Sequence, residues 1–206
     1  YDPRTGEAST FGMCEQSGHQ SYRSGILGPS GRFIFAIPFT AKQVLCIDTQ
    51  MRTVRLIGKS FDCGDRGKWV GGGIGGDGCL YCIPFEMQSV LRIDPVAMTT
   101  SLYGPDLHIE NGVDRMWAGG CAGPDGCVYG TPLHANHVLC IDPFAETVSM
   151  VGEPVPEEIN KMLWGAVLAG ENVWFLPSKL PARMLRLKPE ENAVAKSGKS
   201  EDGGWE

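Results

Sequence analysis

The sequence predicts an all-β fold, a β-propeller of four-stranded blades, and three observations lead to this prediction. The 206 residues repeat about every 45–48 residues, each repeat contains four short extended stretches, and 28 glycines with 14 prolines supply many turns. Apolar residues make up 42% of the chain, which is enough for a core. We expect four blades, with a window of a larger propeller as the alternative.

The repeat is clearest in the middle of the chain. Residues 68–104 and 116–152 align without a gap at an offset of 48, and residues 28–58 form a third copy at an offset near 46. A degenerate fourth copy covers residues 161–198. We therefore expect one propeller domain over residues 1–206, whose parts are the end of a preceding repeat (1–12), four repeats (13–58, 59–104, 105–152 and 153–198) and a tail (199–206).

Each repeat contains the same four stretches in the same order. The first is a W-x-G-G segment, which begins at Trp69 and Trp117. The second follows a tight Asp-Gly turn and is apolar on both faces, as expected for a strand between neighbouring sheets. The third reads Val-Leu-x-Ile-Asp, and the fourth is rich in Thr and Val and ends at a glycine. These stretches predict the four strands of one blade.

The second and third strands of a repeat form a hairpin that places two cysteines near each other. If the hairpin of the third blade centres on residues 133–134, Tyr129 faces Val138, and Cys127 and Cys140 become cross-strand neighbours. We predict this pair as a disulfide candidate in an oxidising compartment.

The first twelve residues predict how the propeller closes. They match the end of a repeat, with Gly12 equivalent to Gly104. We expect residues 1–12 to complete the fourth blade and to close a four-bladed ring. The alternative is a longer array in which further blades or a partner cover an open edge.

The motifs resemble the W-x-G-G…D-G-x-[IV]-Y-x-I-P…V-L-x-I-D-P repeat arrays of unicellular eukaryotes, algae and other protists. The period is also similar to that of kelch and WD40 arrays, whose signatures are missing. This resemblance covers nearly the whole chain and implies a propeller, but little about activity. The fourth repeat departs from it, with Met162 in the Trp place and Lys188 in the Asp place.

The composition limits the classes of partner that we expect this protein to bind. The net charge is −6, with 18 basic residues spread along the chain, which argues against nucleic-acid binding. No apolar run approaches the roughly 18 residues of a membrane-spanning helix, so we expect membrane association only through partners. The sequence does not decide the cellular compartment, and the cytoplasm and an organelle such as a plastid are both alternatives.

Three groups of residues could carry chemistry. Asp48, Asp94 and Asp142 could form a ring of carboxylates, but an Asp that ends a strand before a turn explains them unaided. His134, His137 and Cys140 are candidate metal ligands without a clear fourth ligand, and we favour a polar loop. We predict no catalytic residue, no resident metal and no cofactor.

Trp69 and Trp117 could stack a sugar or a base, but their place in the repeat favours packing between blades. The leading functional hypothesis is a non-catalytic interaction or scaffold protein, an accessory subunit of a larger complex. The resemblance to algal and protist arrays suggests an organellar, photosystem-like assembly. The alternatives are a propeller that binds a small molecule or carbohydrate, and a propeller lyase or hydrolase with a metal at one mouth.

Overall fold

The computed structural model describes residues 3–13, 20–62, 64, 66–107, 115–156, 159, 161, 163–178 and 184–189. Within these residues the chain forms strands and no helix, which confirms the predicted all-β fold. The strands make four antiparallel sheets, three with four strands and one with three. The first sheet contains β1 (Tyr22–Leu27), β2 (Phe33–Pro38), β3 (Val44–Asp48) and β4 (Thr53–Ile57); the second β5 (Trp69–Ile74), β6 (Leu80–Pro84), β7 (Val90–Asp94) and β8 (Thr99–Tyr103); the third β9 (Trp117–Ala122), β10 (Val128–Pro132), β11 (Val138–Asp142) and β12 (Thr147–Val151); the fourth β13 (Leu163–Ala169), β14 (Asn172–Pro177) and β15 (Leu185–Leu187).

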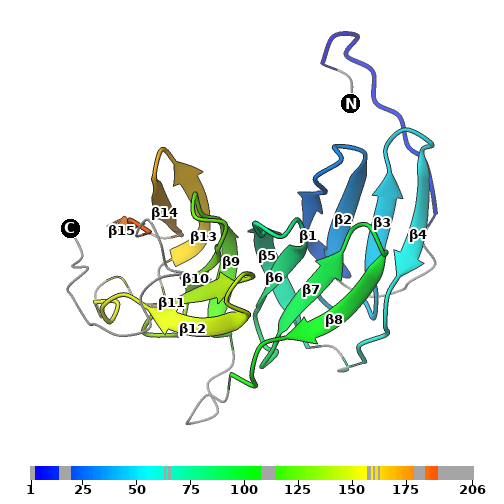
Figure 1. Cartoon of the computed structure of the whole chain (residues 1–206). Coiled ribbons are helices and arrows are strands. Elements are labelled where there is room, and N and C mark those ends of the chain that lie inside the picture. The colour runs from blue at the N-terminus through cyan, green and yellow to red at the C-terminus, as the bar shows by residue number, and fades with distance from the viewer. Residues whose placement is uncertain are drawn as a thin grey trace.

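The four sheets follow one another along an arc, with the first and fourth sheets at its two ends (Figure 1). In each sheet the strands are hydrogen-bonded in chain order, and β1, β5, β9 and β13 are the inner strands. Neighbouring inner strands contact one another from sheet to sheet. This is how blades stand around a propeller axis.

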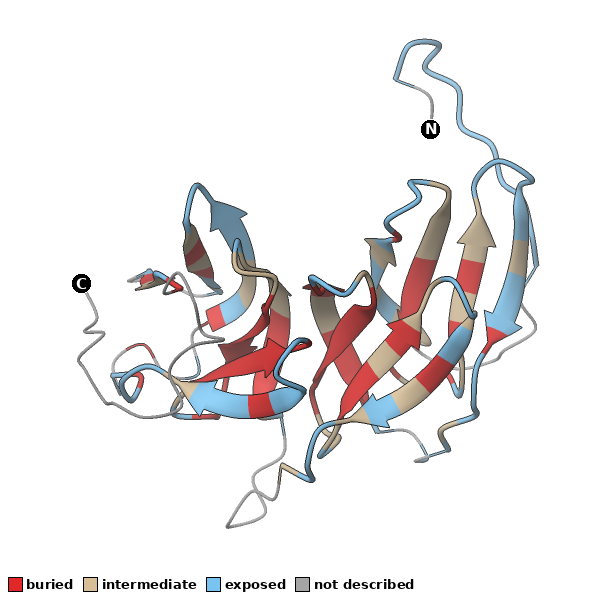
Figure 2. Ribbon diagram, in the orientation of Figure 1, coloured by how far each residue is buried: buried red, intermediate tan, exposed pale blue. Residues whose placement is uncertain are grey.

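Three apolar cores lie between successive sheets. In the first core, Phe35 of the first sheet packs with Leu80 and Leu91 of the second. Tyr81 packs in the equivalent core between the second and third sheets, and Tyr129 packs in the one between the third and fourth sheets. A strand between two cores is buried on both faces, as Figure 2 shows for the middle of the molecule, and all residues of β6 and β10 are buried.

The hairpin of the third sheet has a different register from the expected one. Tyr129 faces Cys140 rather than Val138. The amides of the three residues that follow Pro132 all donate to the Met116 carbonyl. These bonds hold the loop at the start of the inner strand. With Tyr129 facing Cys140, Cys127 lies diagonally across from Cys140.

Residues 3–13, which we call the leading segment, do not complete the fourth sheet. They lie against β4 at the outer edge of the first sheet, where Arg52 Nη2 donates to Ser9 Oγ at 3.0 Å and the guanidinium stands 5.5 Å from the Phe11 ring centroid. No strand of the described residues pairs this segment with the fourth sheet, and closure of a four-bladed ring through it stays a prediction. The last part of repeat 153–198 and the tail 199–206 lie outside the described residues.

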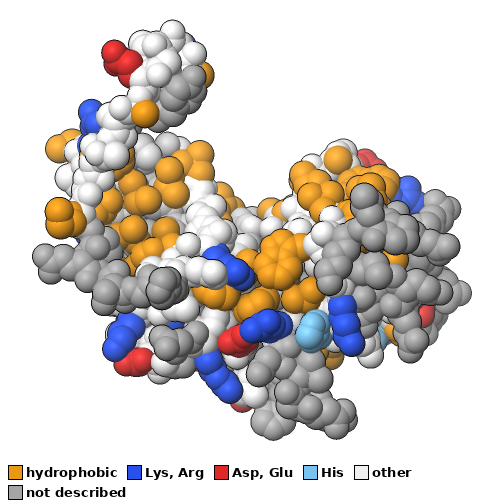
Figure 3. Space-filling view, turned by 180° about the vertical axis from the view of Figure 1, so that it is seen from behind, with side chains coloured by type: hydrophobic (Ala, Val, Ile, Leu, Met, Phe, Trp, Pro, Cys, Tyr) orange, Lys and Arg blue, Asp and Glu red, His pale blue; other side chains and the backbone are white. Residues whose placement is uncertain are grey.

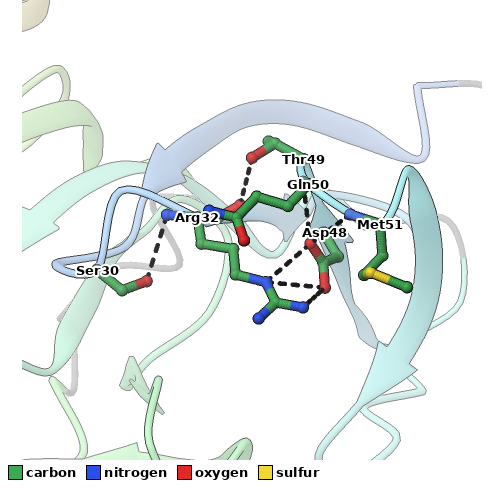
Figure 4. A network of polar contacts seen from close by, with 6 residues as sticks. All are labelled: Ser30, Arg32, Asp48, Thr49, Gln50 and Met51. Carbon is green, nitrogen blue, oxygen red and sulfur yellow. Dashed lines mark hydrogen bonds and ion pairs between the residues drawn. The ribbon is translucent and has the colours of Figure 1, made fainter.

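The repeated aspartates end the third strand of each of the first three sheets. Asp48 Oδ1 accepts the amides of Gln50 and Met51, both at 3.0 Å, and Arg32 Nε also donates to it at 3.0 Å (Figure 4). Asp94 and Asp142 each accept the amides two and three residues ahead in the same way. This confirms the interpretation of these aspartates as turn residues.

Candidate functional site

The inner strands and the loops after the second strands surround a hollow of about 620 Å³, which we call the mouth. Its lining residues come from β1, β13, the loops after the second strands and the connections before the inner strands: Gln20, Arg23, Phe39, Arg66, Gly67, Phe85, Glu86, Arg115, Leu133, His134 and Trp164. Figure 3 shows basic side chains and a histidine gathered around hydrophobic side chains on this side of the molecule. The mouth is the place where the fold brings different repeats together.

A relay of backbone hydrogen bonds holds the rim of the mouth. Each bond joins the start of an inner strand to the loop after a second strand, and the relay passes from the first sheet to the fourth. The bonds, from donor amide to acceptor carbonyl, are Phe39 to Ser21, Lys68 to Phe39, Phe85 to Lys68, Met116 to Phe85, Leu133 to Met116 and Lys161 to Leu133, with N···O distances of 2.8–3.2 Å. The rim residues are therefore positioned by the backbone of their neighbours.

Positive charge dominates the mouth. Among the described residues that line it, Arg23, Arg66 and Arg115 are basic, while Glu86 is the one carboxylate. Glu86 accepts the Arg115 Nε at 2.9 Å and the Gly67 amide at 3.0 Å. This pair orients the Arg115 guanidinium at the rim and leaves the described lining residues with a net positive charge.

Aromatic rings form the floor between these charges. The Arg23 guanidinium stands 4.3 Å from the centroid of the Phe39 ring and 5.8 Å from that of Trp164. Phe85 packs between them, 5.5 Å from Phe39 and 6.0 Å from Trp164, measured between ring centroids. Trp164 is 42% exposed, so its ring is available to a ligand.

The rim is built with strained backbone. Gln20, Arg115 and Lys161 have φ values of 58°, 69° and 65°, in the left-handed region that favours glycine. These three occupy the same place, just ahead of the inner strand, in three different repeats. Such strain persists where the surrounding structure determines the conformation, and it concentrates at functional sites.

His134 is the one predicted metal candidate that lines the mouth. Burial lowers its pKa, and the nearby charges of Lys161 and Arg115 lower it further. Cys140 instead points into the core between the third and fourth sheets, and His137 uses its carbonyl to accept the Trp117 indole N–H at 3.1 Å. Across the residues that the structure describes, no three His, Cys, Asp or Glu side chains stand together as a metal site would require.

The disulfide candidates lie in that same core. Cys127 and Cys140 are on one face of the third sheet, and both are free thiols. A hydrogen bond to Cys140, together with burial, raises the pKa of Cys127 well above its ordinary value. The thiols are neighbours in an apolar core, and a disulfide between them stays a prediction.

The tryptophans of the repeats are structural. Trp69 and Trp117 are fully buried, and their indole N–H groups donate to the carbonyls of Ser89 and His137. In the fourth sheet, Leu163 rather than Met162 takes this place, because Leu163 pairs with Pro177 as Trp117 pairs with Pro132. Packing between blades is confirmed for this position.

Sequence reasoning missed most of the mouth. Arg23 and Trp164 stand in their repeats where Val70 and Ala118 stand in the middle two. In the first and fourth repeats a large or charged residue therefore replaces the small apolar residue that directly follows the Trp position, near the propeller axis. That departure was visible in the aligned repeats, but the convergence of these side chains was not.

Comparison with known proteins gives the fold. No protein-family model matches the chain, and no curated protein matches it. Virginiamycin B lyase from Staphylococcus aureus is a similar solved structure, with a TM-score of 0.61, 15% identity, and coverage of 82% of this chain and 52% of that one. The WD40 repeats of RRP9 match with a TM-score of 0.60 and 13% identity, over 84% of this chain and 50% of theirs.

A third match is hydrazine synthase from Kuenenia stuttgartiensis, with a TM-score of 0.56, 14% identity, and coverage of 90% of this chain and 48% of that one. This chain thus spans about half the length of the solved structures it matches. At these identities the likeness shows the β-propeller fold alone. No helix long and apolar enough to cross a membrane occurs in the described part of the chain.

Proposed function

We propose that this protein is a non-catalytic interaction module whose mouth binds an acidic segment of a protein partner. The observation that carries the proposal is the gathering of Arg23, Arg66 and Arg115 around aromatic rings in one hollow. A guanidinium group matches a carboxylate with two parallel hydrogen bonds. Arginine and aromatic residues are also the side chains enriched at the centres of protein interfaces.

Glu86, the one carboxylate among the described lining residues, supports binding over catalysis. Glu86 is engaged by the Arg115 guanidinium and the Gly67 amide. A general base needs a carboxylate aimed at a substrate proton, whereas this one orients an arginine. For this reason we prefer an interaction module to a propeller lyase or hydrolase.

A small-molecule or carbohydrate ligand is the second candidate. The partly exposed Trp164 ring, with Arg23 beside it, favours a ring-bearing ligand that could stack there. The same mouth would then hold a smaller occupant.

The resemblance of the repeats to algal and protist arrays supports the wider proposal of an accessory subunit in an organellar, photosystem-like complex.

A labelled oligoglutamate peptide with one tryptophan tests the proposal by fluorescence anisotropy. We expect binding that weakens between about 50 and 200 mM salt, because the attraction is between charges. Arg23→Ala and Arg115→Ala should each weaken binding about tenfold, which is about 1.4 kcal/mol for one charge-assisted contact.

Lys188→Ala is the matched control, since it also removes one positive charge but acts on a side chain that is 70% exposed and lies outside the mouth. Its affinity for the peptide should equal that of the wild type. Equal losses in all three variants would contradict a mouth-specific site. Binding of sugars that depends on Trp164, without binding of the peptide, would favour the second candidate.

A further inference from the structure

A second hollow lies on the first sheet, at the opposite end of β2 from the mouth. It has a volume of about 270 Å³, and we call it the β2–β4 cleft. Its lining residues come from the residue before β2 and from β2, β3 and β4: Arg32, Phe33, Cys46, Asp48, Thr53 and Arg55. Phe33 and Cys46 also pack in the core between the first two sheets, so the cleft lies on the face of the first sheet toward the second. None of the six lines the mouth.

The turn before β2 is one residue longer than its equivalents, and this extra residue lines the cleft. In the first sheet the Gly28 amide donates to the carbonyl of Phe33, five residues ahead, at 2.7 Å. In the second and third sheets the equivalent bonds join residue 75 to 79 and residue 123 to 127, four residues ahead, both at 2.8 Å. Arg32 is therefore an additional residue without a counterpart in these two sheets.

The pair of residues at the centre of the cleft also departs from the repeat. Cys46 faces Arg55 between β3 and β4, where the second sheet pairs Arg92 with Ser101. In the second sheet the guanidinium fills this space, because Arg92 Nη2 donates to Cys79 Sγ at 2.8 Å. The first sheet has a short thiol in place of that long side chain. The space is therefore open, and an arginine stands at its outer side.

The carboxylate in the cleft is already bonded by its neighbours. Arg32 Nε donates to Asp48 Oδ1 at 3.0 Å and to Oδ2 at 3.1 Å, and Arg32 Nη2 also donates to Oδ2. The amides of Gln50 and Met51 donate to Oδ1. Figure 4 shows that these bonds use one side of the guanidinium and that the other terminal nitrogen, Nη1, points away from Asp48. Arg32 Nη1 is therefore a donor that a ligand can use.

Arg55 adds a positive charge to the cleft. It makes no ion pair with a carboxylate of the described residues and stands beside the Cys46 thiol. Burial raises the pKa of Cys46 more than Arg55 lowers it, so the thiol carries no charge at neutral pH. Two guanidinium groups and one carboxylate give the lining residues a net charge of about +1. The Thr53 hydroxyl is a further donor in this lining.

From these observations we propose that the β2–β4 cleft binds the phosphate group of a small phosphomonoester. Guanidinium groups match phosphate oxygens in charge and geometry. Arg32 lies on the β2 side of β3, and Thr53 and Arg55 lie on the β4 side, so their donors can reach different oxygens of a tetrahedral group. The volume is just below the roughly 300–1,000 Å³ of pockets for drug-sized ligands, which leaves room for a phosphate and a few carbon atoms.

NMR titration of the nitrogen-15-labelled chain with glycerol phosphate tests the site. We expect saturable shifts of the amide signals around Arg32, Cys46 and Arg55, while those of the mouth residues stay in place. Arg55→Ala should weaken binding at least about tenfold, because it removes a charge-assisted donor. Arg55 is exposed, so far-ultraviolet circular dichroism of this variant should match that of the wild type.

Arg52→Ala is the matched control, because it removes one positive charge from the turn beside the cleft. Its side chain bonds to Ser9 and does not line the cleft, so its affinity for the ester should equal that of the wild type. Arg115→Ala, which changes the mouth, should also bind normally. Equal weakening in Arg52→Ala and Arg55→Ala would overturn the proposal, and so would shifts confined to the mouth or an absence of saturable shifts.

Inorganic phosphate and acetate, used as separate probes, identify the group that the cleft binds. We expect inorganic phosphate to cause the same shifts with lower affinity than the ester, because part of the cleft stays unfilled. Acetate should bind more weakly than either, since a planar carboxylate engages fewer of the donors. Equal affinity for inorganic phosphate and the ester would overturn the assignment to a phosphomonoester. Tighter binding of acetate would overturn the assignment to phosphate.

Discussion

The first and second sheets are built from nearly the same repeat, yet they differ in what covers them. Leu45 and Leu91 occupy one repeat position and pair with equivalent neighbours on the fourth strand. Leu91 is fully buried because the first sheet lies against it, whereas Leu45 is half-buried at the end of the arc. The comparison teaches that burial in this fold comes from the adjoining blade rather than from the sheet itself.

Truncation of these two leucines should give the largest difference in the free energy of unfolding between the two sheets. Leu91→Ala removes a fully buried side chain and leaves a cavity, so we expect a loss of about 3 kcal/mol in the free energy of unfolding. Leu45→Ala should cost about 1 kcal/mol in dilute protein, where the end face meets water. Urea unfolding of both variants measures the difference, and equal costs would contradict the comparison. A cost for Leu45→Ala that rises with protein concentration would show that its face becomes covered.

Substitutions at the aromatic position of the second strand should give the next largest difference in stability between the two sheets. In the second sheet Tyr81 donates its hydroxyl to Asp77 at 2.9 Å, so Tyr81→Phe should lose about 1 kcal/mol. In the first sheet Phe35 is fully buried, and Ser30 rather than a carboxylate stands in the Asp place, where its hydroxyl accepts the Arg32 amide as Asp77 accepts that of Cys79. Phe35→Tyr would therefore bury a hydroxyl without its partner and should cost about 2 kcal/mol. If thermal unfolding shows the two sheets responding alike, the Asp–Tyr pair is not what distinguishes them.

The smallest effect concerns the turn after the third strand. In the first sheet the Arg32 guanidinium and two turn amides lower the pKa of Asp48 to about 2. A carboxyl with a lowered pKa stabilises the fold above its unfolded value of 3.8, and this contribution is lost as the pH falls through about 2. In Arg32→Ala the pKa of Asp48 should rise toward 3.8.

Carbon-detected NMR titration of the Asp48 carboxyl measures that pKa directly. Arg55→Ala is the control, since it removes a neighbouring arginine that does not bond to Asp48. An Asp48 pKa that stays near 2 in Arg32→Ala would mean that the turn amides suffice. The first and second sheets would then be alike at this turn.

Much of the candidate site could not be predicted from the sequence. His134 was singled out for its spacing to His137 and Cys140, yet it lies at the mouth beside Arg115 of its own repeat and Lys161 of the next. Arg23 and Trp164 are about 140 residues apart in the chain and meet only because the inner strands of different sheets converge on one axis. Residues that break the repeat next to the Trp place were the available signal.

The sequence by itself determined the strands, the Asp-Gly and Asp-capped turns and the order of the sheets, because these depend on contacts within a few tens of residues. Only the tertiary structure showed that Tyr129 pairs with Cys140 and that three loop amides bond to the Met116 carbonyl ahead of the inner strand. It also decided that the leading segment lies on β4 and that Leu45 is less buried than Leu91. The repeated sequence shows which faces of each sheet are apolar. Whether such a face is shielded from water depends on the blade that packs against it.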